Sequence, residues 1–245
     1  MGGNTTVTGM VLTAMPIGDY DKRITILTRE RGKITAFARG ARRSNSQILA
    51  ASNPFVFGEF EVYEGRSTYT MSRAEISNYF RELASDYETV CYGSYFVEMA
   101  EYYGQENADE RERLKLLYQS LRALESHKFS SQLIRNIYEF KTMVINGEYP
   151  NVFSCFCCGN SEELIHFSVR MRGVVCKDCS AEHPGSPISQ SLLYALQYIV
   201  SSPIQKLYTF VLTPEVEQEF TELLRKYRVA YQEHSFKSES FLNAL

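Results

Sequence analysis

The sequence lacks several features that define large classes of protein. No apolar run approaches the roughly 18–20 residues that a membrane helix needs, so a helical membrane protein is excluded. The G-x-S-x-G, phosphate-loop and G-x-G-x-x-G patterns are absent, and the four histidines form no H-E-x-x-H or H-x-E arrangement. We therefore expect no enzyme and no small-molecule substrate.

Other features concern the compartment and the class of fold. Residues 1–11 contain neither a basic region nor an apolar block, so we expect no secretory signal and a cytoplasmic chain. Thiols stay reduced there, and the six cysteines indicate metal binding or catalysis before disulfides. The 44% of hydrophobic residues is too high for a wholly disordered chain, and 245 residues suffice for one or two domains.

The net charge of −3 hides an uneven distribution. Residues 1–80 carry ten Lys or Arg against seven Asp or Glu, whereas residues 81–154 carry eight against twelve and residues 155–245 eight against ten. Within residues 22–43, eight cations face only Glu30, a local charge of +7. These cations are Lys22, Arg23, Arg29, Arg31, Lys33, Arg39, Arg42 and Arg43. An acidic total therefore does not exclude a polyanionic partner.

Residues 1–80 alternate short apolar-polar segments with turns, which is the pattern of strands. Gly32 closes a four-residue turn between two of these segments, where it is free to adopt a positive φ. Five strands in 80 residues fit a small closed or partly closed barrel. The expected strands cover residues 7–15, 23–28, 33–39, 55–63 and 67–73.

After residue 80 the apolar residues recur with the period of helices. We expect the first helix to place Leu83, Tyr87 and Val90 on one buried face. Thr213 is expected to cap the last helix, with Pro214 in its first turn. The expected helices cover about residues 83–97, 114–124, 133–144, 189–201 and 214–227.

Two Cys-x-x-Cys pairs with 17 residues between them form the most specific pattern. Gly159 permits a tight turn after the first pair, and two pairs complete the tetrahedral four-sulfur shell that Zn²⁺ favours. We predict one structural Zn²⁺, because a catalytic zinc needs an open coordination position. An iron–sulfur cluster and a reduced site without metal are the alternatives. The predicted ligands are Cys155, Cys158, Cys176 and Cys179.

Four nearby or remaining residues could complicate this site. Cys157 is interpreted as a bystander, because choosing it as a ligand would leave a one-residue spacing from Cys155. His166 and His183 flank the pairs and could substitute as ligands, although surface or core histidines are the simpler interpretation. Cys91 lies among apolar helical residues and is interpreted as a small buried side chain.

The basic stretch allows two interpretations. Its cations either hold phosphates without reading sequence, or form an ordinary solvated strand face. The near absence of acids, and a Gly-containing loop at residues 39–44, favour phosphate binding. Neighbouring aromatic residues could stack bases, although most should fill the barrel. They are Tyr20, Phe37, Phe55, Phe57, Tyr63 and Tyr69.

Ordered motifs along the chain resemble the RecO family of bacterial recombination mediators. The similar segments are residues 18–24, 28–33, 38–44, 147–158, 173–179 and 234–242, in the family's order and over almost the whole chain. The resemblance implies a multidomain α+β protein: an N-terminal OB-fold at residues 1–80, then a helical domain at residues 81–245. A four-cysteine zinc ribbon at about residues 152–184 would be inserted in the helical domain.

The resemblance also implies a function in DNA repair and homologous recombination. It implies binding to single- and double-stranded DNA, annealing of complementary strands, and help with RecA loading, together with RecR, on DNA coated with single-strand-binding protein. The implied location is the cytoplasm of a bacterium, at the nucleoid. The acidic tail of single-strand-binding protein should need an apolar groove with a basic rim.

We hypothesise that Lys22, Arg23, Arg39, Arg42 and Arg43 hold phosphates, and that Arg29, Arg31 and Lys33 are weaker candidates. Arg170 and Arg172, beside the ribbon, could extend the same track. Two alternatives remain open: a zinc-containing protein-interaction scaffold that touches nucleic acid only incidentally, and a zinc hydrolase.

Overall fold

The structure is a computed structural model that describes residues 3–66, 68–242 and 244. Its contacts form two compact units. The barrel unit comprises Met1–Glu125 and Phe236–Leu245, and the ribbon unit comprises Ser126–Ser235. The ribbon unit is therefore an insertion, because the chain leaves the barrel unit and returns to it. The predicted division into domains at residue 80 stays a prediction.

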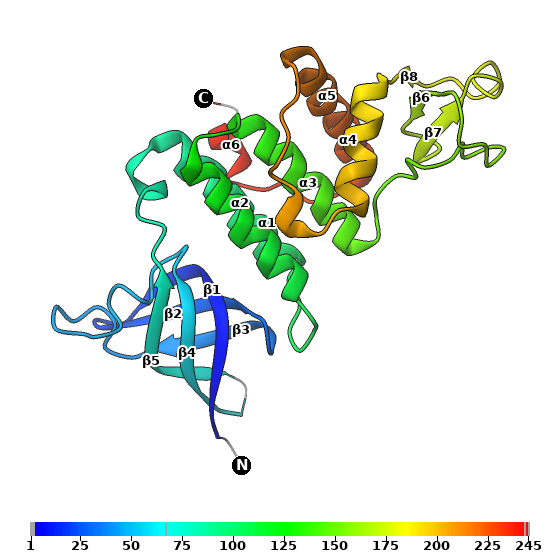
Figure 1. Ribbon diagram of the computed structural model, residues 1–245. Helices are drawn as coiled ribbons and strands as arrows, with labels where there is room; N and C mark the ends of the chain where they lie inside the picture. The colour runs from blue at the N-terminus through cyan, green and yellow to red at the C-terminus, as the bar shows by residue number, and fades with distance from the viewer. Residues whose placement is uncertain (1–2, 67, 243, 245) are drawn as a thin grey trace. The chain divides into compact units, whose positions relative to one another are not determined.

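Five strands of the barrel unit form a closed barrel, drawn in blue to cyan in Figure 1. The strands are β1 (Asn4–Ile17), β2 (Asp21–Thr28), β3 (Gly32–Ala38), β4 (Phe57–Glu64) and β5 (Tyr69–Asn78). Their order around the barrel is β1-β2-β3-β5-β4, with β3 and β5 parallel and the other neighbours antiparallel. This confirms the predicted five-stranded OB-fold barrel.

Alternation of side chains explains why these segments close into a barrel. Val7, Ile24, Ile26 and Phe60 point inward and are fully buried, whereas intervening residues face outward. Gly32 adopts a φ of 67°, as predicted. A Cβ at this position would lie 2.3 Å from the backbone carbonyl oxygen of Gln105. Glycine is thus required both by the turn and by the close approach of another backbone.

The barrel unit also contains the turn η1 (Leu83–Ser85), the helices α1 (Tyr87–Tyr103) and α6 (Glu239–Leu242), and all but the last residue of α2 (Arg111–Ser126). The expectation that Leu83, Tyr87 and Val90 share a buried face was wrong, because Tyr87 is 68% exposed. Asp86 caps α1 by accepting a hydrogen bond from a backbone N–H of the first turn. Helix α1 therefore begins after Leu83, which lies in η1, so the predicted buried face is not part of one continuous helix.

The C-terminal segment packs on α1 of the barrel unit. Phe236 is 4% exposed and meets the Tyr95 ring edge-on, with 5.6 Å between ring centroids. The Glu98 carboxylate accepts hydrogen bonds from the backbone N–H groups of Lys237 and Ser238, at 2.9 and 2.8 Å, and from the Ser238 hydroxyl. These contacts close the unit after the insertion.

Replacing Phe236 with alanine is expected to destabilise the barrel unit by about 3 kcal/mol, because it leaves a cavity among aromatic rings. Urea unfolding followed by circular dichroism measures the change. Phe241→Ala is the matched control: that ring is 55% exposed, so its removal should cost within about 0.5 kcal/mol. Equal effects of the two variants would show that the Phe236 contact contributes no stability.

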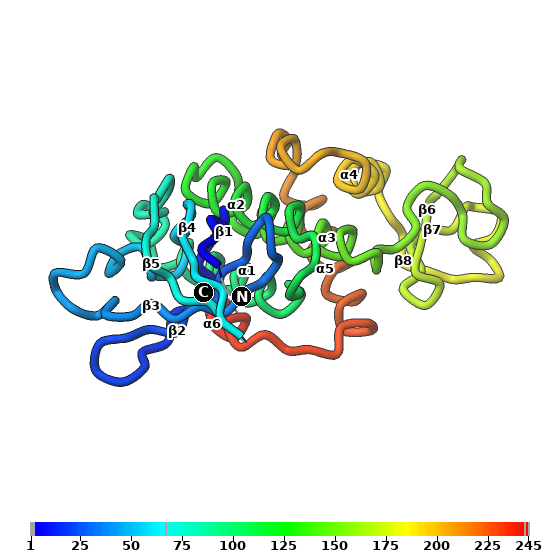
Figure 2. The backbone as a smooth tube through the Cα atoms, turned by 90° about the horizontal axis from the view of Figure 1, so that it is seen from below, coloured from blue at the N-terminus to red at the C-terminus, as the bar shows by residue number. Residues whose placement is uncertain are grey.

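The ribbon unit combines helices with a small sheet, drawn in green to orange in Figures 1 and 2. Its helices are α3 (Ser131–Asn146), α4 (Gln190–Ser201) and α5 (Pro214–Tyr231), with the turn η2 (Ile204–Lys206). The antiparallel sheet has the order β7-β6-β8, formed by β6 (Leu164–Ser168), β7 (Gly173–Cys176) and β8 (Ser186–Pro187). Among the described residues, no helix combines the length and apolarity that crossing a membrane requires.

Buried charges join the three helices of the ribbon unit. Glu139 of α3 is 3% exposed and accepts hydrogen bonds from Arg135 at 2.7 Å and from Arg228 of α5 at 2.8 Å. Lys141 donates to three carbonyl oxygens at the end of α4, which neutralises the negative end of that helix. Each buried charge therefore has a partner, as burial requires.

Thr213 occupies the predicted N-cap position of α5, but its side chain makes no hydrogen bond to the helix backbone. Its hydroxyl instead faces Glu215. Hydrogen bonds from the backbone N–H of Glu215 and from the Thr213 hydroxyl hold the pKa of the Glu215 carboxyl below its usual value. Pro214 supplies the helical φ at the first position, so the helix starts as predicted with a different cap contact.

Candidate metal site and nucleic-acid interface

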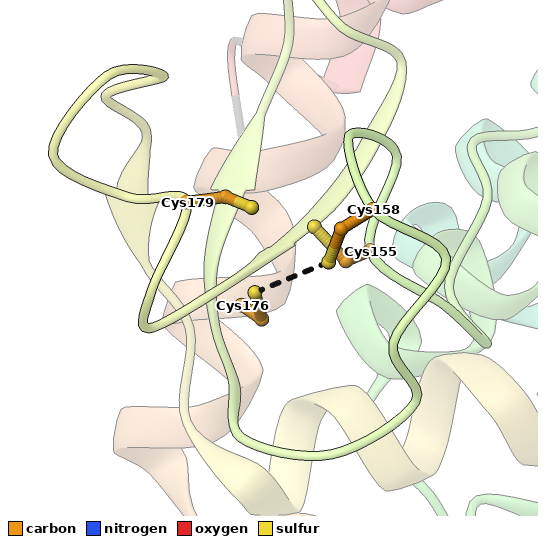
Figure 3. A group of neighbouring side chains, drawn as sticks. All are labelled: Cys155, Cys158, Cys176 and Cys179. Carbon is orange, nitrogen blue, oxygen red and sulfur yellow. Dashed lines mark hydrogen bonds between the residues drawn. The ribbon is translucent and has the colours of Figure 1, made fainter.

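The four predicted ligands come together at one end of the small sheet. Cys155 and Cys158 lie on the loop before β6, while Cys176 ends β7 and Cys179 follows in the next turn. The four sulfurs lie within 4.8 Å of one another and point into a common space, as Figure 3 shows. The Sγ atoms of Cys158 and Cys176 are 3.7 Å apart. A tetrahedral ion with Zn–S distances of about 2.3 Å places its sulfurs about 3.8 Å apart, so the residues fit zinc.

Local backbone structure positions these ligands. Gly159 has a φ of 77° and donates its N–H to the Cys155 carbonyl oxygen at 2.9 Å, which forms the tight turn that its sequence position predicts. The backbone N–H of Cys155 donates to the Asn160 carbonyl oxygen at 2.7 Å. These short-range contacts build the turn, and the backbone N–H of Phe156 attaches it to β7 by donating to the Val174 carbonyl oxygen at 2.9 Å.

The thiols differ in their acidity. Burial raises the pKa of the Cys155 thiol, but hydrogen bonds from backbone N–H groups, those of Cys176 and Cys158 first, outweigh burial and lower that pKa to about 6. The sulfurs of Cys158 and Cys176 raise the pKa of the Cys179 thiol. The four sulfurs thus behave as one site, in which a cation would displace the remaining thiol protons.

The other candidates stay outside the sulfur cluster. Among the described residues, the group that could hold a metal contains neither Cys157 nor His166 nor His183. Cys157 is exposed, which is consistent with its interpretation as a bystander. Cys91 is 5% exposed on α1, as expected of a small core residue. An all-cysteine, closed shell is the chemistry of a structural site, because it leaves no position for a reacting water.

The basic stretch divides between the two ends of the barrel. Pairing of β2 with β3 sets Lys22 opposite Ala38 at one end, and Thr28 opposite Gly32 at the other. Six residues of strand, about 20 Å, separate these ends. The cations at the first end lie on the start of β2 and on the loop that follows β3; they are Lys22, Arg23, Arg39, Arg42 and Arg43. We call these five residues the basic cluster.

The loop after β3 is attached to the turn between β1 and β2, and both project from the same end of the barrel in Figure 2. The Arg42 guanidinium donates a hydrogen bond to the Gly18 carbonyl oxygen at 3.0 Å. The backbone N–H of Arg42 donates to the Tyr20 carbonyl oxygen at 2.9 Å. The Arg43 guanidinium lies 4.9 Å from the centroid of the Tyr20 ring. Asp21 accepts the Gly40 N–H at 2.7 Å, which fixes the start of the loop.

The members of the basic cluster differ in their hydrogen bonding and solvent exposure. Lys22 donates to Asn53 at 2.7 Å and to Ser52 at 3.2 Å, and burial and then the Arg42 charge lower its pKa. The four arginines of the cluster are exposed. Within the part of the chain that the structure describes, no member of the cluster forms an ion pair with a carboxylate.

The cations at the other end of the barrel have partners. Arg29 pairs with Glu30 at 2.8 Å, and Arg31 lies 3.6 Å from Glu64. Lys33 donates to the carbonyl oxygen of Glu101 at 2.7 Å, near the end of α1. The structure thus separates the three weaker candidates from the basic cluster, and Lys33 has a structural role that its sequence position did not indicate.

Comparisons with known proteins identify the family to which the chain is related. The family model described as Recombination protein O N terminal matches residues 1–80, and that described as Recombination protein O C terminal matches residues 84–240. The chain belongs to the RecO family. It is 31% identical to the DNA repair protein RecO of Bacillus pumilus, over 97% of this chain and 93% of that relative. Identity to the RecO protein of a Thermoanaerobacter species is 28%, over 96% of both chains.

RecO is a family of DNA repair and recombination proteins, and its N-terminal model spans the barrel with its basic cluster. Two family-like segments, residues 18–24 and 38–44, meet in this structure through the contact between the β1–β2 turn and the loop after β3. The sequence places them 14 positions apart, and the register of the β2–β3 hairpin brings them together.

Arg170 and Arg172 of this RecO-family chain lie in the ribbon unit, at the turn between β6 and β7. Both are exposed, and the Arg172 guanidinium lies 4.0 Å from the centroid of the Tyr231 ring. They belong to another compact unit than the basic cluster, so their place on a common DNA track stays a prediction.

Proposed function

We propose that this RecO-family chain binds single- and double-stranded DNA without sequence specificity, anneals complementary strands and, together with RecR, helps to load RecA on DNA coated with single-strand-binding protein. The observation that carries the proposal is the basic cluster: five cations at the start of β2 and on the loop after β3, none paired with a carboxylate among the described residues. Such a surface attracts phosphates through charge alone.

Annealing follows from this chemistry without a catalytic group. Two strands repel each other through their phosphates, and a surface that neutralises part of both charges lowers the cost of bringing them together. Base pairing then supplies the sequence information. The chain acts here as a mediator rather than as an enzyme, in the cytoplasm at the nucleoid.

One structural Zn²⁺ completes the proposal, held by Cys155, Cys158, Cys176 and Cys179. Support comes from the all-sulfur shell and from the 3.7 Å between the Cys158 and Cys176 sulfurs. When bound, the ion supplies folding free energy to the ribbon. No step of annealing needs it.

A strand-annealing assay tests the proposal. Complementary oligonucleotides coated with the cognate single-strand-binding protein are mixed with the full chain, and duplex formation is followed by fluorescence energy transfer. We expect the chain to accelerate annealing at least about tenfold, with strong inhibition by salt. Absence of both acceleration and oligonucleotide binding at micromolar protein would contradict the proposed function.

A groove in the ribbon unit favours the second candidate, a protein-interaction scaffold. Its volume is about 420 Å³, and its apolar lining includes Tyr194, Tyr198, Phe210 and Val211. We expected a basic rim at the site for the acidic tail of single-strand-binding protein, but the described residues that line this groove include no Lys or Arg. A scaffold would bind partner proteins and show no salt-sensitive affinity for oligonucleotides, which the same titrations measure.

A further inference from the structure

Large apolar side chains are exposed at the end of the barrel that carries the basic cluster. Met15 and Tyr20 are each 53% exposed, and Ile17 is 38% exposed. Single exposed apolar residues are common on protein surfaces. Here three of them occupy six consecutive positions, at the end of β1 and in the turn to β2. We call these three residues the apolar tip.

Contacts with arginines hold the apolar tip in place. The Arg43 guanidinium lies 4.9 Å from the centroid of the Tyr20 ring, and the Arg23 guanidinium lies 3.4 Å from the Met15 sulfur. Arg42 is hydrogen-bonded to the turn that carries Tyr20. Because the contacts join this turn to the loop after β3, the Tyr20 ring does not have to be ordered when a ligand arrives.

Single-stranded nucleic acid fits this combination of groups. Its unpaired bases offer π-faces for the aromatic ring and the neighbouring apolar side chains, while its phosphates meet the guanidinium groups. In a duplex the bases are stacked on each other and only the phosphates are available at this site. An acidic peptide without aromatic residues would satisfy the arginines but would supply no aromatic ring to stack on Tyr20.

We propose that Tyr20, with the exposed Met15 and Ile17 that precede it in the chain, is a base-stacking platform that makes this end of the barrel bind single strands in preference to duplex. The inference rests on the proposed DNA binding and deepens it. The basic cluster supplies affinity for both forms of DNA, and the apolar tip supplies the difference between them.

The chain contains no tryptophan, which makes a direct spectroscopic test available. Tyr20→Trp introduces a single indole at the platform. Oligothymidylate is expected to quench that fluorescence strongly, because thymine stacks on the indole ring. A blunt duplex of equal length, at concentrations where anisotropy shows it bound, should leave the fluorescence nearly unchanged.

Tyr20→Ala tests the contribution to affinity in the full-length protein. We expect about tenfold weaker binding of oligothymidylate, and duplex affinity within about twofold of the original protein. Tyr87→Ala is the matched control, because Tyr87 is a 68% exposed tyrosine on α1 of the same unit, outside the apolar tip and outside the aromatic residues that could stack bases. It should leave both affinities unchanged. Thermal melting of both variants checks that the barrel stays folded.

The outcomes separate the two proposals. If the original protein binds neither form of DNA, the proposed function fails. If it binds both, but Tyr20→Ala weakens them equally or not at all and the indole at position 20 is not quenched, the base-stacking platform is wrong and the proposed function stands. Quenching by oligoglutamate and not by oligothymidylate would likewise overturn it, in favour of an acidic peptide.

Discussion

Replacing Cys176 with serine is expected to abolish metal binding and to unfold the ribbon. Cys176 is 1% exposed, at the end of β7, and its sulfur lies 3.7 Å from that of Cys158. A serine hydroxyl is a poor zinc ligand, and structural zinc contributes on the order of 10 kcal/mol to small zinc modules. We expect bound zinc to fall from one per chain to near zero, and the melting temperature of the ribbon unit to fall by at least about 10 °C.

Metal analysis by mass spectrometry and calorimetry measure these two effects. Cys157→Ser is the matched control, because it removes an exposed thiol from the same loop, outside the four-sulfur group. It should retain one zinc and the original melting temperature. Removing zinc from the original protein with a chelator should reproduce the loss seen for Cys176→Ser. An undiminished melting temperature after complete removal of the metal would contradict the structural role.

The cluster of four cysteines could be predicted almost completely from the sequence. The residues of a Cys-x-x-Cys turn are close in sequence, and Gly159 adopts the positive φ that this turn needs. The barrel was predictable for a related reason, because alternation along each strand reports directly which residues face inward. Ile24 and Ile26 are fully buried, as that alternation requires.

Features that depend on long-range pairing were not predictable in this way. Nothing in the pattern near Phe236 indicates that this residue returns to α1, 141 positions from its ring partner Tyr95. The side-chain period also misplaced Tyr87, because the cap at Asp86 sets where α1 begins. Lys33 looked like another cation of the charge run until its contact with the end of α1 was located.

The site shows the same division between local and long-range information. A run of eight cations on the sequence does not say which of them share a surface. The β2–β3 register sends Arg29 and Arg31 to the end of the barrel where carboxylates meet them, and leaves Arg39 and Arg42 at the other end. The DNA affinity contributed by the arginines at one end of the barrel can therefore be compared with that contributed by the arginines at the other end.

Removing the three loop charges, by Arg39→Gln, Arg42→Gln and Arg43→Gln together, is expected to weaken DNA binding strongly and to make it less dependent on salt. Each phosphate contact on a single strand contributes about 0.7 to the slope of log K against log salt concentration. Losing three contacts should therefore reduce the magnitude of the slope by about 2. Fluorescence anisotropy with a labelled oligonucleotide, at several salt concentrations, measures it.

The matched control removes the same three charges elsewhere on the barrel, through Arg29→Gln, Arg31→Gln and Arg66→Gln. Both triple variants lower the net charge equally, so a long-range effect of total charge would change both slopes by the same amount. Direct phosphate contacts at the basic cluster predict a smaller slope for the loop variant and a nearly original slope for the control. Equal slopes for the two variants would assign the affinity to the overall field of the barrel and contradict a phosphate site on the loop after β3.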